Sequence, residues 1–157
     1  MIRYPRGNGA GVSWHGEPFE VLPAGKGRML REGADVALLT VGTVGHAAAR
    51  AAERAAAEGV SVAHYDLRFA KPLDEEILVE VGAHFGRVVT IEDGSLRGGV
   101  GETIAAWFNR HGFRPEVCSL GVGDEWIEHG TPAQLQALCD YDEESILQTI
   151  LQNKGAE

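Results

Sequence analysis

The sequence is poor in the residues and motifs that mark metal sites and membrane spans. Its two cysteines, Cys118 and Cys139, form no CxxC pair, so neither a zinc site nor a thiol-redox motif is predicted, and a reduced, cytoplasmic protein is the simplest interpretation. No apolar run approaches the roughly 18 residues of a membrane-spanning helix, and no signal-peptide pattern is present. The sequence therefore predicts no association with a membrane.

Positive charge is also scarce. The 14 Lys and Arg residues stand against 23 Asp and Glu residues, which gives a formal net charge of −9. This sign is wrong for a general nucleic-acid partner, because phosphate backbones attract basic surfaces. A length of 157 residues, with 44% hydrophobic and 24% charged residues, is typical of one ordinary globular domain.

The common catalytic motifs are absent as well. Neither Ser13 nor Ser95 lies in a GxSxG nucleophile elbow, and there is no HExxH motif, EF-hand loop or Walker P-loop. Gly99 and Gly101 match the first two glycines of the dinucleotide fingerprint, but Ile104 replaces the third. As a stand-alone enzyme, the chain has very few groups to work with.

The loop from Glu92 to Gly101 has two interpretations. It joins a predicted strand to a predicted helix, and the free N–H groups of that helix, around Gly98 to Gly101, could receive an anion. The spacing of the glycines favours the alternative of a tight strand-to-helix turn. Glu92 and Asp93, which would repel a phosphate, also favour it. His129, which precedes a glycine, could likewise bind a ligand or belong to a structural turn.

A regular alternation of strand and helix patterns fills the chain from residue 34 onward. Ala34–Val41 is almost continuously apolar, as in strands that are buried on both faces. Val44–Glu58 holds eight alanines before Gly59, which predicts a helix with a glycine cap. Further strands are expected at residues 60–67, 88–91 and 116–120, and further helices after Asp74, at 101–111, from Thr131 to 139 and from Asp142 to about 153.

This alternation predicts the fold class. Strands that alternate with helices at this spacing form a parallel sheet with right-handed crossovers. We therefore expect a doubly wound α/β domain, with a mostly parallel sheet and helices on both faces, over residues 34–157. Residues 1–33 are expected to be a short irregular linker with two edge strands, at Phe19–Leu22 and Gly27–Arg31.

Two arginines stand on a stiff segment at the start of the chain. Pro5 restricts Tyr4 to extended conformations, so Arg3 and Arg6 lie on an extended stretch, and their guanidinium groups suit phosphate and carboxylate. Because a basic segment of this kind stands at the very start of the sequence, we expect the chain to be a fragment of a longer protein.

Several segments, taken together, resemble one known family. In chain order they are Arg3-Tyr4-Pro5-Arg6-Gly7, Asp66-Leu67-Arg68-Phe69-Ala70-Lys71-Pro72-Leu73-Asp74, Glu92-Asp93 followed by Gly98-Gly99-Val100-Gly101, and Gly123-Asp124-Glu125-Trp126-Ile127-Glu128-His129-Gly130-Thr131. With these segments the chain resembles, over essentially its whole length, the carboxyl-terminal third of the 1-deoxy-D-xylulose-5-phosphate synthases of the transketolase superfamily. It departs from that family at Gly121–Asp124, where Gly-Leu-Pro-Asp is usual, and at Gly94, where asparagine is common.

The resemblance implies an activity for the complete protein. Those enzymes condense pyruvate with glyceraldehyde 3-phosphate, release carbon dioxide, supply isoprenoid and thiamine synthesis, and use thiamine diphosphate and magnesium. The Gly-Asp-Gly and Asn motif that holds the cofactors is absent here, so we expect no cofactor, metal or catalytic residue in this fragment and no activity from it alone. Arg6 matches the arginine that helps to hold the phosphate of glyceraldehyde 3-phosphate. The expected partners are the upstream domains of the same polypeptide and a second copy in a homodimer.

Two other interpretations remain open. The chain could be the corresponding domain of a transketolase or of a 2-oxo-acid dehydrogenase β-subunit, or a free-standing module that binds an anion at Gly98–Gly101. In each case Arg68, which follows a buried strand, is expected to make an ion pair near the start of the next helix rather than to contact substrate.

Overall fold

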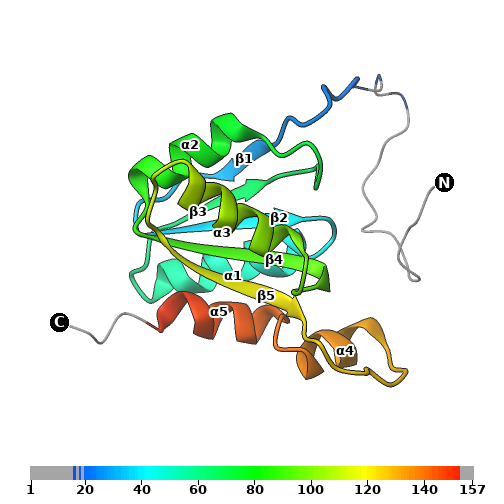
Figure 1. Ribbon diagram of the computed structural model, residues 1–157. Coiled ribbons are helices and arrows are strands. Elements are labelled where there is room, and N and C mark those ends of the chain that lie inside the picture. The colour runs from blue at the N-terminus through cyan, green and yellow to red at the C-terminus, as the bar shows by residue number, and fades with distance from the viewer. Residues whose placement is uncertain (1–15, 17, 19, 153–157) are drawn as a thin grey trace.

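Five strands form a single sheet in the computed structural model, which describes residues 16, 18 and 20–152 (Figure 1). The order across the sheet is β1-β3-β2-β4-β5. Strands β2 (Val36–Val41), β3 (Val62–Asp66), β4 (Arg87–Ser95) and β5 (Glu116–Val122) are parallel, and β1 (Arg28–Arg31) pairs antiparallel with β3 at one edge. The predicted mostly parallel sheet is confirmed.

Helices cover both faces of this sheet. Helices α1 (Gly45–Ala57) and α5 (Glu143–Leu151) pack on one face, and α2 (Glu75–His84) and α3 (Val100–Arg110) pack on the other (Figure 1). Helix α4 (Pro132–Leu138) has no buried residue and lies beyond the end of β5. The domain is therefore doubly wound, as the alternation of patterns predicts.

The two faces are filled by different side chains. On one face four fully buried alanines of α1 pack against the sheet, and they are Ala48, Ala51, Ala52 and Ala55. On the other face Trp107 and Phe108 of α3 pack edge to face, with ring centroids 5.8 Å apart. Small residues let α1 approach the sheet closely, whereas large rings fill the space under α3.

The predicted helix caps are confirmed. The Asp74 side chain accepts a hydrogen bond from the backbone N–H of Glu76 at 3.1 Å, and Asp142 accepts one from Ser145 at 2.9 Å. Thr131 forms a capping box with Gln134 at the start of α4. Each cap satisfies N–H groups that have no partner inside the helix, so local sequence alone sets where these helices begin.

The predicted strand at Phe19–Leu22 is wrong over its described residues. Residues 20–22 form no strand, and Val21 is 90% exposed. Pro23 follows, and its carbonyl accepts a hydrogen bond from the N–H of Lys26 at 3.2 Å in a turn, so the chain changes direction before it reaches β1. Strand propensity without a neighbouring strand does not make a strand. Phe19 itself lies outside the described residues.

Strand β1 is the second of the predicted edge strands and belongs to the same sheet as the rest of the domain. The division of the chain near residue 33 stays a prediction. Among the described residues, no helix is long and apolar enough to cross a membrane.

Candidate functional site

Charged residues of the described family-like segments, at 66–74, 92–101 and 123–131, gather at one edge of the sheet. The parallel strands end there, at Val41, Asp66, Ser95 and Val122. Because β1 runs antiparallel and Arg28 pairs with Asp66, β1 begins at this same edge. We call it the carboxyl edge. In open α/β sheets, ligands bind outside the carboxyl ends of the strands, so this edge is the candidate functional site.

The first cluster at the carboxyl edge joins the segment Asp66–Asp74 to residues 25–28, and we call it the clasp. Asp74 is 5% exposed, and besides capping α2 its carboxylate accepts a hydrogen bond from the backbone N–H of Gly27 at 3.0 Å. The ammonium group of Lys26 lies 3.5 Å from the same carboxylate. The helix cap therefore also holds the chain that leads into β1.

Asp66 serves the same clasp from the end of β3. Its carboxylate accepts a hydrogen bond from Arg28 Nε at 3.1 Å and another from the backbone N–H of Arg68 at 3.1 Å. The Arg68 guanidinium lies 4.0 Å from Asp66. Arg68 thus makes an ion pair, as expected, but with the acid two residues before it rather than with an acid at the start of α2. It is part of the clasp.

The glycine loop before α3 is filled by the chain's own carboxylates. Glu92 Oε1 accepts a hydrogen bond from the backbone N–H of Gly101 at 3.0 Å, and Glu102 Oε2 accepts one from Gly98 at 2.8 Å. A Cβ atom on Gly101 would lie 2.4 Å from Ser119 Oγ, so the glycine permits a close approach of helix and strand. These contacts favour the tight structural turn over a site for an external anion.

Asp93, the neighbour of Glu92, also bonds within the domain. Asp93 Oδ1 accepts a hydrogen bond from the hydroxyl of Tyr141 at 3.0 Å, and Tyr141 is 3% exposed. Burial, together with the hydrogen bond to Asp93, raises the pKa of Tyr141, so the phenol stays protonated and donating. This bond ties the connection between α4 and α5 to the end of β4.

The loop after β5 behaves differently, and we call residues 123–131 the Trp126 loop. Trp126 is 96% exposed, and His129 is exposed and bonds to none of the described residues. Asp124 Oδ2 forms an ion pair with Arg97 Nη1 at 2.8 Å, which links this loop to the loop after β4. The exposure of Trp126 was not foreseen from the sequence, although a single aromatic residue among glycines and acids was the available signal.

The described residues offer no site for the cofactors of the resembling family. No group of three His, Cys, Asp or Glu side chains among them could hold a metal ion. At the start of α3 the N–H of Gly101 donates to Glu92, and the N–H of Gly98, just before the helix, donates to Glu102. The described residues therefore contain no such three-ligand group for magnesium, and the carboxylates of Glu92 and Glu102 disfavour a diphosphate at the glycine turn. Arg6, the predicted contact for the substrate phosphate, lies outside the described residues.

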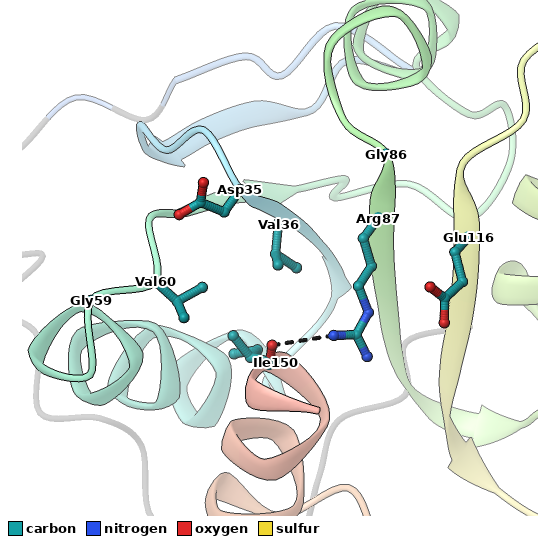
Figure 2. Close-up of a pocket in the computed structure, with 8 residues that line it drawn as sticks. All are labelled: Asp35, Val36, Gly59, Val60, Gly86, Arg87, Glu116 and Ile150. Carbon is teal, nitrogen blue, oxygen red and sulfur yellow. Dashed lines mark hydrogen bonds between the residues drawn. The ribbon is translucent and has the colours of Figure 1, made fainter. Parts of the chain in front are cut away.

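A cavity of about 420 Å³ lies at the opposite edge, where the parallel strands begin. Figure 2 shows Arg87 reaching from β4 toward α5, where its Nη1 donates to the carbonyl of Ile150 at 3.2 Å. Arg87 is 8% exposed, and its Nε has no hydrogen-bond partner among the described residues. This guanidinium fastens the last turn of α5 to the sheet, where a cation is favourable at the helix C-terminus.

A buried histidine lies in β3, just before the clasp. His64 is 1% exposed, and its Nε2 lies 2.9 Å from Thr40 Oγ1, which in turn donates to the carbonyl of Tyr65. Because the single hydroxyl proton of Thr40 goes to Tyr65, Nε2 is the donor to Thr40. Burial lowers the pKa of His64 to about 4, although nearby Asp66 opposes this shift. His64 is a neutral core residue.

Comparison with protein families agrees with this arrangement. The family described as "Transketolase, C-terminal domain" matches residues 25–146, which include the whole sheet. The chain belongs to the transketolase C-terminal domain family. The matched residues include both the clasp and the glycine turn.

The curated relatives are 1-deoxy-D-xylulose-5-phosphate synthases. The protein of Bacteroides fragilis is 54% identical over 154 residues, which are 98% of this chain and 24% of that protein. The protein of Rippkaea orientalis is 40% identical over 151 residues, again 24% of its length. The chain thus spans about a quarter of the curated relatives it matches, and the predicted resemblance to the C-terminal domain of these synthases is confirmed.

Solved structures agree as well. The structure titled "Split gene transketolase, inactive beta4 tetramer" matches with a TM-score of 0.77 at 31% identity, over 83% of this chain and 43% of that chain. A transketolase from Campylobacter jejuni matches with a TM-score of 0.58 at 14% identity, over 82% of this chain and 19% of that chain. The second likeness supports the fold alone.

Proposed function

We propose that this chain is the C-terminal domain of a cytoplasmic 1-deoxy-D-xylulose-5-phosphate synthase. Such an enzyme joins pyruvate to glyceraldehyde 3-phosphate, releases carbon dioxide, and depends on thiamine diphosphate and magnesium. The observation that carries the proposal is the 54% identity to the Bacteroides fragilis synthase over 98% of this chain.

The proposed role of this domain is to pack against the upstream domains, to contribute to a homodimer and to supply one contact to the substrate phosphate. Its internal chemistry supports that division of labour, because Asp66, Asp74, Glu92 and Asp93 all bond within the domain. Thiamine diphosphate and magnesium would then be held by the rest of the polypeptide. We infer that the chain alone has no activity.

The substrate contact is proposed for Arg6. A guanidinium group can form two parallel hydrogen bonds to a phosphate. The proposal for this residue comes from the resemblance of Arg3–Gly7 to the corresponding segment of the synthases. Arg3 and Tyr4 are assigned a structural role.

A chimeric enzyme tests the function. The region of the Bacteroides fragilis synthase that matches this chain is replaced by this chain, and product formation from pyruvate and glyceraldehyde 3-phosphate is measured. We expect the chimera to be active, and the chain alone, as a control, to give no product and no heat of binding with thiamine diphosphate and magnesium. A folded but inactive chimera would contradict the proposal, and so would stoichiometric cofactor binding by the chain alone.

The same chimera tests Arg6. We expect Arg6→Ala to lower kcat/KM for glyceraldehyde 3-phosphate by roughly ten- to a hundredfold, because a charge-assisted hydrogen bond contributes roughly 1.5–3 kcal/mol. Formation of the first adduct from pyruvate is expected to be almost unchanged, since pyruvate has no phosphate. Arg6→Lys keeps the charge without the fork and is expected to recover part of the loss. Unchanged acceptor kinetics with a lowered Tm would show that Arg6 is structural.

A second candidate is the corresponding domain of a transketolase, which the 31% identity to the split-gene transketolase favours. The chimera distinguishes the two, because a transketolase domain is not expected to pack against the upstream part of the synthase and restore its activity. The anion-binding module is disfavoured by the carboxylates of Glu92 and Glu102 on the glycine loop.

A further inference from the structure

A large aromatic side chain stands in solvent at the carboxyl edge. Trp126 is 96% exposed, which is the highest exposure of any large hydrophobic residue in the described part of the chain. Val21 is next, at 90%. A tryptophan presents roughly 150–250 Å² of mostly apolar surface. Tryptophan is also enriched among the residues that contribute most to protein interfaces. The position of Trp126 is therefore suited to contact with another surface.

The Trp126 loop is fastened on both sides of this residue. Asp124 pairs with Arg97 at 2.8 Å on one side, and the capping box of Thr131 and Gln134 starts α4 on the other. Between them Ile127 turns inward and lines a hollow of about 290 Å³ with Leu96 and Leu138. The inward Ile127 leaves the neighbouring Trp126 directed outward. A loop held in this way loses little conformational freedom when it binds.

The net charge around Trp126 is negative, although Arg97 pairs with Asp124. Glu125 and Glu128 are exposed and make no ion pair with the described residues, and Asp124 is 65% exposed although it is paired. A surface that receives Trp126 would therefore need an apolar pocket with a basic rim, since like charges across an interface are unfavourable. A second copy of the same loop does not meet this need, because it would bring acid against acid.

We propose that Trp126 anchors this domain on the upstream part of the same polypeptide, in an apolar pocket with a basic rim. This inference rests on the proposed function, in which this chain is the final domain of a longer enzyme. The chain makes up 24% of the Bacteroides fragilis relative, so most of such a polypeptide lies outside it. Strand β1 begins at the carboxyl edge, so the preceding polypeptide reaches the same edge that carries the Trp126 loop, with β1 and β5 as the outermost strands of the sheet.

The test measures binding between this chain and a shortened synthase that lacks the corresponding domain. The probe is the Bacteroides fragilis synthase without the region that matches this chain, and its affinity for this chain is measured by isothermal titration calorimetry. We expect Trp126→Ala to weaken binding at least tenfold and Trp126→Phe to weaken it less. The matched control is Val79→Ala, another exposed apolar residue, on α2 and 48% exposed, which is expected to bind normally. Thermal midpoints of all three variants are expected to equal that of the unaltered chain.

Charge gives a second readout of the same interface. The double variant Glu125→Lys, Glu128→Lys is expected to weaken binding, and raising the ionic strength from about 0.05 to about 0.5 M is expected to weaken binding of the unaltered chain, because salt screens exposed charges. Binding that is insensitive to both changes would overturn the basic rim.

Three outcomes would overturn the inference. The first is that Trp126→Ala binds the shortened synthase as tightly as the unaltered chain does. The second is that this chain self-associates in sedimentation and Trp126→Ala abolishes that self-association. The third is that this chain does not bind the shortened synthase although the chimera is active. The last result would leave the proposed function standing, whereas a folded, inactive chimera would remove the function whatever the binding result.

Discussion

The clasp and the Trp126 loop lie at the same edge of one sheet, yet they use their side chains in opposite ways. In the clasp, Asp74 is 5% exposed and bonds to Gly27 across 47 positions of sequence. In the Trp126 loop, Trp126 is 96% exposed and the acids beside it face solvent. Both segments carry family-like motifs, so motif content alone does not distinguish them.

The difference shows that a family-like motif can serve either the interior of its own domain or a contact with another surface. The clasp motif fits its own domain, because the carboxylates of Asp66 and Asp74 find partners inside the fold, and buried polar groups need such partners. The Trp126 loop is held by the Asp124–Arg97 ion pair and by the capping box of Thr131, but it leaves its largest apolar side chain outside. We conclude that the clasp stabilises the domain and that the Trp126 loop is the part suited to contact another surface.

The largest expected effect on stability is that of removing the Asp74 carboxylate from the clasp. Asp74→Ala removes a helix cap and leaves the N–H of Gly27 without a partner, so we expect the free energy of unfolding to fall by about 3 kcal/mol. Urea denaturation measures it. The control is Glu75→Ala, an exposed neighbour, which is expected to change stability by less than about 0.5 kcal/mol. Equal effects of the two variants would erase the contrast between clasp and surface.

The strand that leads into the clasp adds a dependence on pH. Burial lowers the pKa of His64 to about 4 from its usual 6.5, so the unfolded chain binds a proton more readily than the folded one between these values. The contribution of neutral His64 to the free energy of unfolding is therefore fully present above pH 6.5 and is lost as pH falls toward 4. We expect the free energy of unfolding to be lower by about 2 kcal/mol at pH 5. We expect His64→Gln to flatten this slope, measured by denaturation at several pH values, and Val79→Ala, at an exposed position that does not titrate, to leave it unchanged. Parallel slopes for all three proteins would contradict the assignment.

The smallest expected effect compares one glycine from each region. Gly25 in the clasp has φ +74, and a Cβ atom there would lie 2.7 Å from Pro72 Cγ, whereas nothing lies within 4 Å of Gly123 in the Trp126 loop. We expect Gly25→Ala to lower stability by about 1–2 kcal/mol, because of backbone strain and the contact with Pro72. Gly123→Ala is expected to stay within about 0.5 kcal/mol. Thermal unfolding of the two variants side by side is the measurement, and a reversed order would refute the comparison.

The sequence was a good guide wherever a structural signal acts over a few residues. Asp74, Thr131 and Asp142 cap the helices that they were expected to begin, and Gly59 ends α1 with φ +81. These signals are local hydrogen bonds and backbone preferences, so they can be read from neighbouring letters. The strand expected at residues 20–22 failed because a strand also needs a partner, which no local pattern supplies.

By itself, the sequence determined the class of fold and the order of the helices and strands from β1 onward, because hydrophobic periodicity and capping act within a few residues. Its motifs carried the resemblance to the family. Only the tertiary structure decided which polar groups are used inside the domain. It bonds Asp74 to Gly27 and Tyr141 to Asp93, and it closes the glycine turn with Glu92. The same folding leaves Trp126 in solvent. Such pairings join residues that are distant in sequence, and their geometry exists only when the sheet has formed and brought its strand ends to one edge.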